Sequence, residues 1–357
     1  MLVPDIRRVA VLRALMLGDL LCATPALRAL RHGLPGAHIT LVGLPWAREW
    51  VLRLQSVDAF IEFPGWPGLP ERKPADARSR LDFLVDMAAR KFDLALQFQG
   101  SGAIVNTLTA AFGARLNAGF CTRGGAAPAN DTARFLLWPE TGTEVERLLA
   151  LTDHLGLPRQ GLHLEFPLAD ADRAQANALL HEPDGTQRGS ADTPRWVLVH
   201  PGSQWPSRRW PAERFAAVAD RLATQGCRIA LTGSAAEADL TRAVAQAMQA
   251  PALDLAGATS LWSLGALVER ASLVVCNDTG ISHVAAALGT PTTVIASGSD
   301  VRRWSPEDEV RHAVLWHDLP CRPCSHAVCP IDNACARAVE SSAVERVALR
   351  QLQRATA

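Results

Sequence analysis

The sequence of 357 residues contains no tyrosine and only two lysines, Lys73 and Lys91. It also lacks a charge excess, because 36 basic side chains balance 36 acidic ones. Without a concentrated basic surface there is no electrostatic reason to expect nucleic acid as a partner. No stretch approaches the roughly 20 apolar residues that span a bilayer. The N-terminal apolar run is interrupted by Arg7, Arg8 and Arg13 and has no small-residue cleavage site. This favours the first strand of a fold over a signal peptide, and we therefore expect a cytoplasmic protein.

Several catalytic signatures are missing as well. The first predicted strand is not followed by GxGxxG, and GxxxxGK(S/T) is absent, which disfavours dinucleotide dehydrogenases and P-loop enzymes. The zinc signature HExxH and the nucleophile elbow GxSxG are also absent. The hydrophobic fraction of 48% still fits a globular protein, and the length suggests two domains.

Short apolar strands alternate with helices in both halves of the chain, which predicts α/β domains with parallel sheets. We expect an N-terminal domain over 1–180, a polar linker over 181–194, a C-terminal domain over 195–335 and a final helix within 336–357. Strands are expected within 7–14, 37–45, 57–65, 92–100, 195–203, 227–234, 253–260, 272–276 and 290–298, the last strand. Helices are expected within 23–35, 47–55, 77–91, 101–113, 140–156, 169–180, 210–226, 235–248, 261–271, 281–289 and 341–353.

The strand at 272–276 leads into the turn Asp278-Thr279-Gly280 and then into a helix. Asp278 or Thr279 can cap that helix, and Gly280 lets the backbone approach a ligand closely. Free N–H groups at a helix N-terminus favour a phosphate, and His283 lies near enough to reach the same ligand. The alternative is an ordinary strand–helix turn with a capping side chain and a packed histidine.

Two other loops follow strands in the C-terminal half. His200, Ser203, Arg208 and Arg209 lie in the first, where arginine forks match phosphate oxygens, although a solvated arginine pair is the alternative. Glu237 follows the next strand and can accept hydrogen bonds from ribose hydroxyls. The helix dipole alone also explains an acidic residue in a first helical turn.

Gly18-Asp19 forms the corresponding turn after the first strand of the N-terminal half. A carboxylate at this position can act as general base on an acceptor hydroxyl. The alternative is a cap for the following helix. Asp170 and Asp172 open a helix rather than follow a strand, so we interpret them as capping residues with no metal implied.

Together these segments resemble glycosyltransferase family 9, the ADP-heptose:lipopolysaccharide heptosyltransferases. The resemblance rests on VLRALMLGDLLCATPALRALR, HPGSQWPSRRWPAERF, LTGSAAE and AGATSLWSLGALVERASLVVCNDTGISHVAAALGTP, in the family's order along the chain. It implies the GT-B fold, with two Rossmann-like domains whose parallel sheets face a cleft and a C-terminal helix that crosses back to the first domain. It also implies that the first domain binds the acceptor and the second binds the nucleotide sugar.

The resemblance also implies roles for individual residues. Asp19, with Gly18 beside it, would be the general base that deprotonates the acceptor. Arg208 stands where the family often has lysine and would stabilise the diphosphate, with Ser203 beside it. Glu237 would hold the ribose. The residues expected to bind the diphosphate and the donor sugar are Asp278, Thr279, Gly280 and His283.

Four of the eight cysteines lie close together, at Cys321, Cys324, Cys329 and Cys335. Their compact spacing suits a structural zinc or iron–sulfur site but does not match the usual paired CxxC arrangement. Similar cysteines in many relatives favour a structural role. Reduced thiols and disulfides are the alternatives.

The predicted function is inverting transfer of a heptose or related sugar from a nucleotide sugar, with ADP-heptose as the expected donor. The expected acceptor is a lipopolysaccharide-type glycolipid or oligosaccharide, which implies peripheral contact with the inner face of the cytoplasmic membrane. The family's chemistry implies that the transfer needs no cofactor or metal. A nucleotide-sugar epimerase of the same fold and a non-catalytic nucleotide-sugar-binding protein are the alternatives.

Overall fold

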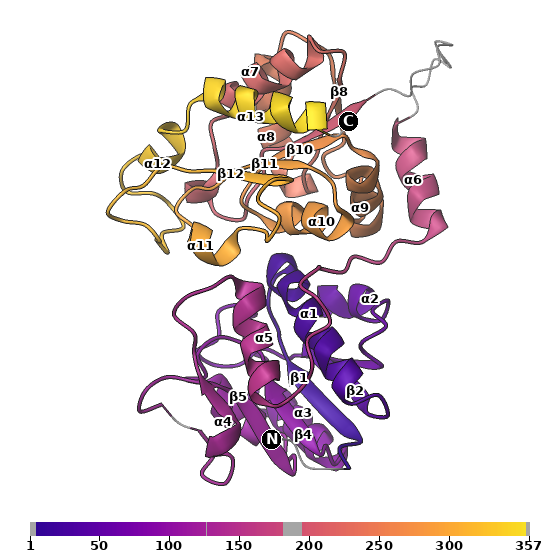
Figure 1. The fold of residues 1–357 in the computed structure, drawn as a ribbon, viewed down its shortest axis with the longest axis vertical. Helices are drawn as coiled ribbons and strands as arrows, with labels where there is room; N and C mark the ends of the chain where they lie inside the picture. Colours follow the sequence, from indigo (N-terminus) through magenta and orange to yellow (C-terminus); the bar gives the residue numbers. More distant parts are fainter. Residues whose placement is uncertain (1–4, 126, 181–194, 355–357) are drawn as a thin grey trace. The chain divides into compact units, whose positions relative to one another are not determined.

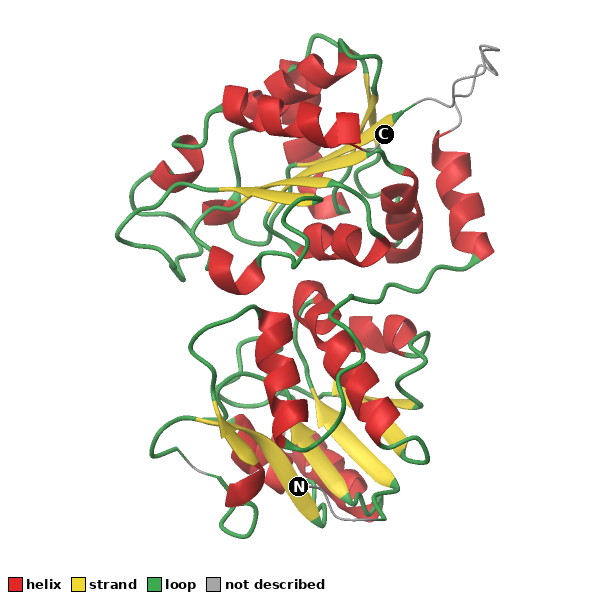
Figure 2. Cartoon of the chain, in the orientation of Figure 1, coloured by secondary structure: helices red, strands yellow, loops and turns green. Residues whose placement is uncertain are grey.

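The computed structural model describes residues 5–125, 127–180 and 195–354. The chain divides into two compact units, Met1–Pro167 and Leu168–Ala357. Each unit is built around one six-stranded sheet, and every strand pairing within the two sheets is parallel. Helices accompany the strands in both units, as Figure 2 shows. The prediction of two Rossmann-like α/β halves is therefore confirmed.

The first unit alternates strands and helices from its first strand onward (Figure 1). Its sheet has the strand order β3-β2-β1-β4-β5-β6. The strands are β1 (Arg8–Leu12), β2 (His38–Gly43), β3 (Ala59–Glu62), β4 (Leu94–Gln97), β5 (Leu116–Cys121) and β6 (Phe135–Leu137). The helices are α1 (Leu17–Gly33), α2 (Arg48–Val51), α3 (Ala77–Ala89), α4 (Val105–Ala110) and α5 (Glu144–His154).

The second unit repeats this plan with the strand order β12-β11-β10-β7-β8-β9. Its strands are β7 (Trp196–His200), β8 (Arg228–Leu231), β9 (Ala252–Asp254), β10 (Leu273–Asn277), β11 (Thr292–Ile295) and β12 (His312–Leu315). Its helices are α6 (Asp170–Leu180), α7 (Ala212–Ala223), α8 (Ala238–Ala247), α9 (Leu261–Arg270), α10 (Gly280–Leu288), α11 (Val301–Trp304), α12 (Ala334–Arg337) and α13 (Ser341–Arg354).

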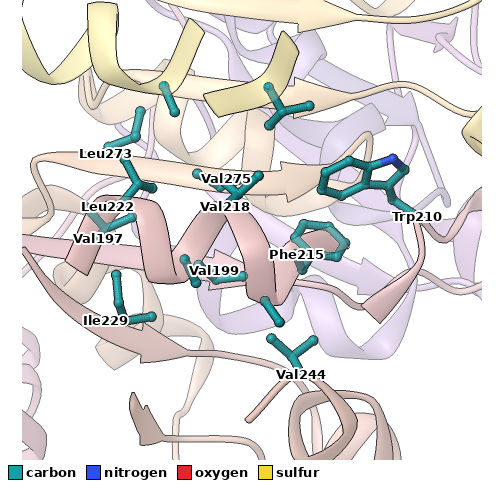
Figure 3. Packing of buried hydrophobic residues seen from close by; sticks show 14 of the residues in the cluster. Val197, Val199, Trp210, Phe215, Val218, Leu222, Ile229, Val244, Leu273 and Val275 are labelled. Atoms are coloured by element: carbon teal, nitrogen blue, oxygen red, sulfur yellow. The ribbon is translucent and has the colours of Figure 1, made fainter. Parts of the chain in front are cut away.

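The core of the second unit forms because β7 and β10 are buried along their whole length, are apolar up to their last residues, and pack against the amphipathic helix α7. Phe215, Val218 and Leu222 repeat at helical spacing on α7, which gives the helix one buried stripe. Figure 3 shows this stripe packed against valines of the two strands. The Trp210 ring closes one end of the cluster, edge-on to Phe215 with 5.0 Å between ring centroids.

The final helix belongs to the second unit, which corrects the expectation that it returns to the first. Val344, Ala348 and Leu352 on α13 are buried in the same core cluster as the β7 valines. Figure 1 shows α13 running beside α7. The spacing of four residues places these three side chains on one face, and that face is covered by α7, β10 and β11.

The unit boundary also differs from the expected one at 180. The helix α6 lies after the boundary, at 170–180, and packs on α9. Arg173 of α6 binds Glu269 through two hydrogen bonds of 2.7 and 2.8 Å, and Arg270 donates to Asn177 at 2.8 Å. The expected linker over 181–194 lies outside the described residues.

Three strands were not anticipated. β5 and β6 follow the last strand expected in the first half, and β12 follows the one expected to be last in the chain. All three lie in the outer half of their sheets, where β6 and β12 occupy the edges. Edge strands need less apolar sequence than central ones, which is why short segments such as HAVL at 312–315 gave little signal.

Among the described residues, no helix combines the length and the low charge that crossing a membrane requires.

Candidate active site

Both sheets reverse their strand order at one place, and in an open parallel sheet this place is where ligands bind. In the first unit the reversal lies between β1 and β4, and in the second it lies between β7 and β10. Connections leave the two central strands toward opposite faces of the sheet, so a crevice opens outside their carboxyl ends. The predicted Asp19 follows β1, and the predicted Ser203 and Asp278 follow β7 and β10.

Asp19 is a half-buried residue in the first turn of α1. The helix begins at Leu17, so Gly18 and Asp19 are helical rather than in a turn, and Met16 is the cap residue. This excludes the interpretation of Asp19 as the helix cap. The side chain of Arg13, at the end of β1, holds the backbone here, because its Nε donates to the Asp19 carbonyl oxygen at 2.8 Å.

Arg13 is a fully buried cation that organises the carboxyl end of the first sheet. One terminal nitrogen donates to the Phe98 carbonyl after β4, and the other donates to Glu144 at 3.1 Å. Glu144 is the first residue of α5 and is also buried. The pair therefore ties β1, β4, α1 and α5 together around Asp19, and neither charge is left unpaired in the interior.

Glu71 and Gln99 complete a group with Asp19 that we call the first-unit site. Gln99 follows β4, and its Oε1 accepts from the Ala14 amide at 2.8 Å. Glu71 reaches the same place from the loop after β3. Burial raises the pKa of Glu71, and the nearby Asp19 carboxylate raises it further, while Gln99 and a backbone amide oppose the shift. Sequence reasoning missed both residues.

In the second unit, Asn277 joins the loops that follow β7 and β10. It is completely buried at the end of β10. Its Nδ2 donates to the Pro201 carbonyl oxygen at 2.8 Å, and its Oδ1 accepts from the Trp210 amide at 3.0 Å. Asn277 therefore fixes both ends of the loop that carries Ser203 and Arg208. The prediction assigned no role to Asn277, although it directly precedes Asp278.

The helix α10 begins at Gly280, and Thr279 is its cap residue. The Thr279 side chain makes no capping hydrogen bond, so it leaves the first amides of the helix to other partners. Its carbonyl oxygen accepts from the Ser282 hydroxyl at 2.7 Å. Asp278 is held by its own amide, which donates to the Ile295 carbonyl at 3.0 Å. A helix start of this kind suits an anion such as a phosphate.

His283 packs into the protein rather than lying open beside the turn. Its side chain is buried, and its ring lies edge-on to Trp304 with 6.1 Å between centroids. The structure therefore favours the alternative of a packed histidine in the first turns of α10. Direct contact between His283 and a ligand stays a prediction.

Glu237 ends a short 3-10 turn after β8 and lies against the loop after β7. Its Oε2 accepts from the Ser234 amide at 2.9 Å and from the Ser234 hydroxyl at 2.8 Å. Its Oε1 lies so close to Gly202 that an added Cβ there would stand 2.2 Å away. The turn therefore fixes the Glu237 carboxylate through Oε2, and Oε1 lies beside Gly202 at the carboxyl end of the sheet.

The arginine pair is bound to backbone carbonyls and is not a solvated surface pair. Arg208 donates to the Ser297 carbonyl after β11 at 2.7 Å and also to the Cys324 carbonyl. Arg209 donates to the Ser203 carbonyl through Nε at 3.0 Å and through a terminal nitrogen at 2.9 Å. Ser203 itself is buried. Two of the five N–H donors of Arg208 are used in this way.

The loops after β7, β8, β10 and β11 therefore meet at one edge of the second sheet, and we call this group the second-unit site. Asn277 and Glu237 contact the loop after β7, and Arg208 contacts the loop after β11. Burial lowers the pKa of His200, which ends β7 and hydrogen-bonds Thr232 at 3.1 Å, although Glu237 opposes that shift. A neutral His200 adds no positive charge, so the cationic character comes from Arg208, Arg209 and the helix start.

The four clustered cysteines do not form a metal centre within the described residues. All four are free thiols, with Cys321 exposed, Cys324 and Cys329 half-buried and Cys335 buried. Across the described parts of the chain, no group of three or more His, Cys, Asp or Glu side chains could hold a metal ion. The zinc and iron–sulfur hypotheses are therefore not supported, and the reduced-thiol alternative fits the structure.

A cavity of about 560 Å³ lies elsewhere, at the amino end of the second sheet. It is lined by residues of α7, β8 and the α8–β9 connection, including Arg228 and Gln249. Ligands of open parallel sheets bind at the opposite, carboxyl end. Size alone therefore does not make this cavity the active site.

The chain is similar to proteins of one family over most of its length. The sequence model of glycosyltransferase family 9 (heptosyltransferase) matches residues 80–335. Lipopolysaccharide heptosyltransferase 2 of Salmonella typhimurium is 27% identical over 300 residues, which cover 81% of this chain and 82% of that protein. Lipooligosaccharide heptosyltransferase 2 of Haemophilus influenzae is 36% identical over 96 residues, which cover 26% of this chain and only 28% of that relative.

A solved structure shows the same fold. Escherichia coli ADP-heptose lps heptosyltransferase II superimposes with a TM-score of 0.74 over 98% of this chain and 100% of that chain, at 21% identity. This likeness confirms the predicted GT-B architecture of two Rossmann-like units.

Proposed function

Because the chain belongs to glycosyltransferase family 9, we propose that it transfers a heptose or related sugar from a nucleotide sugar to a lipopolysaccharide-type acceptor. The names of the similar proteins support this acceptor and this sugar. The observation that carries the proposal is the half-buried Asp19 carboxylate at the β1/β4 reversal, together with the anion-suited start of α10 beside the β7/β10 reversal.

The second unit is proposed to bind the donor, with ADP-heptose as the expected nucleotide sugar. A solved protein of the same fold is named for that donor. The diphosphate would accept hydrogen bonds from the first amides of α10, near Asp278, Thr279 and Gly280. Arg208 retains N–H donors for the same phosphates, and the fixed Oε1 of Glu237 can accept from ribose hydroxyls.

The first unit is proposed to bind the acceptor, with Asp19 as general base. Asp19 removes the proton of the acceptor hydroxyl while that oxygen attacks the anomeric carbon of the donor sugar. The bond from this carbon to the diphosphate oxygen breaks on the opposite side, so the configuration inverts and ADP leaves. The Arg13 contact to the Asp19 carbonyl keeps the base in position.

Stabilisation of the leaving diphosphate is proposed to come from protein groups alone. Negative charge grows on the diphosphate as the glycosidic bond breaks. Donors that are already oriented stabilise that charge without having to reorganise during the reaction. The loop carrying Arg208 is oriented in this way, because Asn277 and the Ser297 carbonyl fix it. We therefore expect no requirement for a divalent cation.

A glycolipid acceptor would bring the protein to a membrane surface. Peripheral contact at the inner face of the cytoplasmic membrane is therefore part of the proposal.

The proposal is tested by incubating purified protein with ADP-heptose in EDTA, with and without a deacylated lipopolysaccharide core oligosaccharide. We expect ADP release and a product heavier by one heptose only when the oligosaccharide is present. An altered sugar nucleotide in the reaction without acceptor would identify an epimerase instead. Donor binding without turnover on the oligosaccharide would identify a binding protein.

The nucleotide is tested separately by thermal shift with ADP-, UDP-, GDP- and dTDP-sugars. Ligands that bind the folded state raise the apparent melting temperature. We expect the largest rise with the ADP-sugar, and an equal or larger rise with another nucleotide would contradict the proposed donor.

A further inference from the structure

In the first-unit site, Glu71 and Gln99 each have a buried polar atom that lacks a hydrogen bond of good geometry. The Oε2 of Glu71 and the Nε2 of Gln99 are both buried, and the two side chains approach each other, but neither atom makes a hydrogen bond of good geometry. Buried polar atoms are nearly always satisfied, so unpaired ones mark a position where a ligand or water completes the set. Here the unpaired atoms are one acceptor and one donor, which is the combination that a hydroxyl group satisfies.

The orientation of Gln99 is fixed by the backbone. The residue is only 5% exposed, and its Oε1 is occupied by the Ala14 amide. The Nε2 therefore has to face away from Ala14. It lies close enough to Glu71 to influence the ionisation of that carboxyl group. Gln99 thus positions Glu71 on the side of the crevice where Asp19 lies.

The carboxyl group of Glu71 is accessible to a ligand at the carboxyl end of the first sheet. The residue as a whole is partly exposed although one of its oxygens is buried. The Asp19 carboxylate is near enough to act on it electrostatically. Two carboxyl groups this close repel a phosphate or carboxylate and favour neutral hydroxyl groups, which can donate to both.

We propose that Glu71, positioned by Gln99, binds a hydroxyl of a neutral sugar in the acceptor next to the hydroxyl that Asp19 deprotonates. This inference rests on the proposed function and names a specificity residue within it. Glu71 holds the acceptor through a hydroxyl that does not react. No bond to Glu71 forms or breaks during transfer.

The test compares initial rates of ADP release for wild type, Glu71→Ala and Glu71→Gln, with ADP-heptose and deacylated core oligosaccharide varied separately. We expect Glu71→Ala to raise the KM for the oligosaccharide about tenfold, in keeping with loss of a hydrogen bond to a charged group. Glu71→Gln keeps the size and one acceptor oxygen, so its KM should lie between those of wild type and Glu71→Ala. The KM for ADP-heptose should stay within about twofold in both variants.

Asp82→Asn is the matched control, because it removes a carboxylate from the exposed face of α3 in the same unit. Its oligosaccharide KM should match that of wild type. An unchanged oligosaccharide KM in Glu71→Ala overturns the inference, and so does an equal rise in both KM values, which would indicate a structural role. If wild type itself releases no ADP with this oligosaccharide, the proposed function fails and this inference fails with it.

Gln99→Glu gives a second variant that does not change Glu71. The new side chain keeps an oxygen for the Ala14 amide but loses the Nε2 donor. We expect its oligosaccharide KM to rise as in Glu71→Ala. A wild-type value in a folded Gln99→Glu protein would contradict the positioning role of Gln99.

Discussion

Glu237 can lie against Gly202 only because Gly202 has no side chain. A methyl group at this position would stand 2.2 Å from Glu237 Oε1, closer than two non-bonded atoms can approach. Gly202→Ala should therefore displace the carboxylate without removing its charge. We expect the Kd for ADP, measured by calorimetry, to rise about tenfold, because a ribose hydroxyl loses its charged acceptor.

Gly36→Ala is the control for this prediction, because a Cβ at Gly36 meets nothing within 4 Å. It should leave ADP affinity unchanged. Equal ADP affinities in Gly202→Ala and wild type would show that Glu237 does not contact the nucleotide.

Individual site residues were predictable where a motif placed them directly after a strand. Asp19, Ser203 and Asp278 were proposed in this way, and the structure places each of them after a strand, while their roles stay predictions. Glu71 and Gln99 were missed, because their role depends on contacts between loops distant in sequence. The loop that holds Glu71 is rich in proline and glycine and has no periodic pattern that indicates where its side chains point.

At the scale of elements, the buried Arg13–Glu144 pair connects the end of β1 with the start of α5. The two side chains are 0% and 2% exposed, and their atoms are 3.1 Å apart. Glu144→Gln would leave the buried Arg13 charge without its counter-charge. We expect the free energy of unfolding of the first unit to fall by about 3 kcal/mol, measured by urea denaturation.

An exposed ion pair serves as the comparison for this change. Asp86 lies in the last turn of α3 and pairs with Arg90, which directly follows the helix, and their side chains are 53% and 44% exposed. Asp86→Asn should cost less than about 0.5 kcal/mol, because water screens such pairs. Similar costs for Glu144→Gln and Asp86→Asn would contradict the organising role given to Arg13.

Most elements could be predicted from hydrophobic spacing, and the exceptions have physical causes. β7 and β10 are buried on both faces and are apolar up to His200 and Asn277 at their ends, which makes them easy to recognise. β5 contains Asn117 and Gly119, and β12 begins with His312 and lies at the edge of its sheet, so neither resembles a buried central strand. The final helix was found, but its amphipathic pattern does not specify which unit covers its apolar face.

At the scale of the whole molecule, acid should weaken the second unit through buried histidines. Burial lowers the pKa of His312 from 6.5 to about 4. Below pH 6.5 the unfolded chain therefore binds a proton that the folded chain does not. The free energy of unfolding should fall between pH 6.5 and 4, by about 3 kcal/mol from this residue.

His312→Gln should reduce this loss, measured as the difference in unfolding free energy between pH 7 and pH 4.5. Exposed His38, at the start of β2, provides the control variant His38→Gln. Identical pH dependence in wild type and His312→Gln would contradict the burial argument.

The two units repeat one topology, and this repetition made the overall architecture predictable. In each sheet the strand order reverses once, and we expect the chemistry at that point. The balanced charge of the chain is consistent with binding a diphosphate, because Arg208, Arg209 and the start of α10 lie together in the second-unit site. The grouping of α6 and α13 with the second unit was not predictable, because it depends on tertiary packing rather than on local sequence.

The central claim is that Asp19 activates the acceptor while the second unit holds the donor. The most direct test measures heptose transfer and ADP binding in parallel for wild type and Asp19→Ala. We predict that the variant loses transfer by at least about a hundredfold, as expected for removal of a general base, while its Kd for ADP stays within about twofold. Transfer at the wild-type rate by Asp19→Ala would contradict the account.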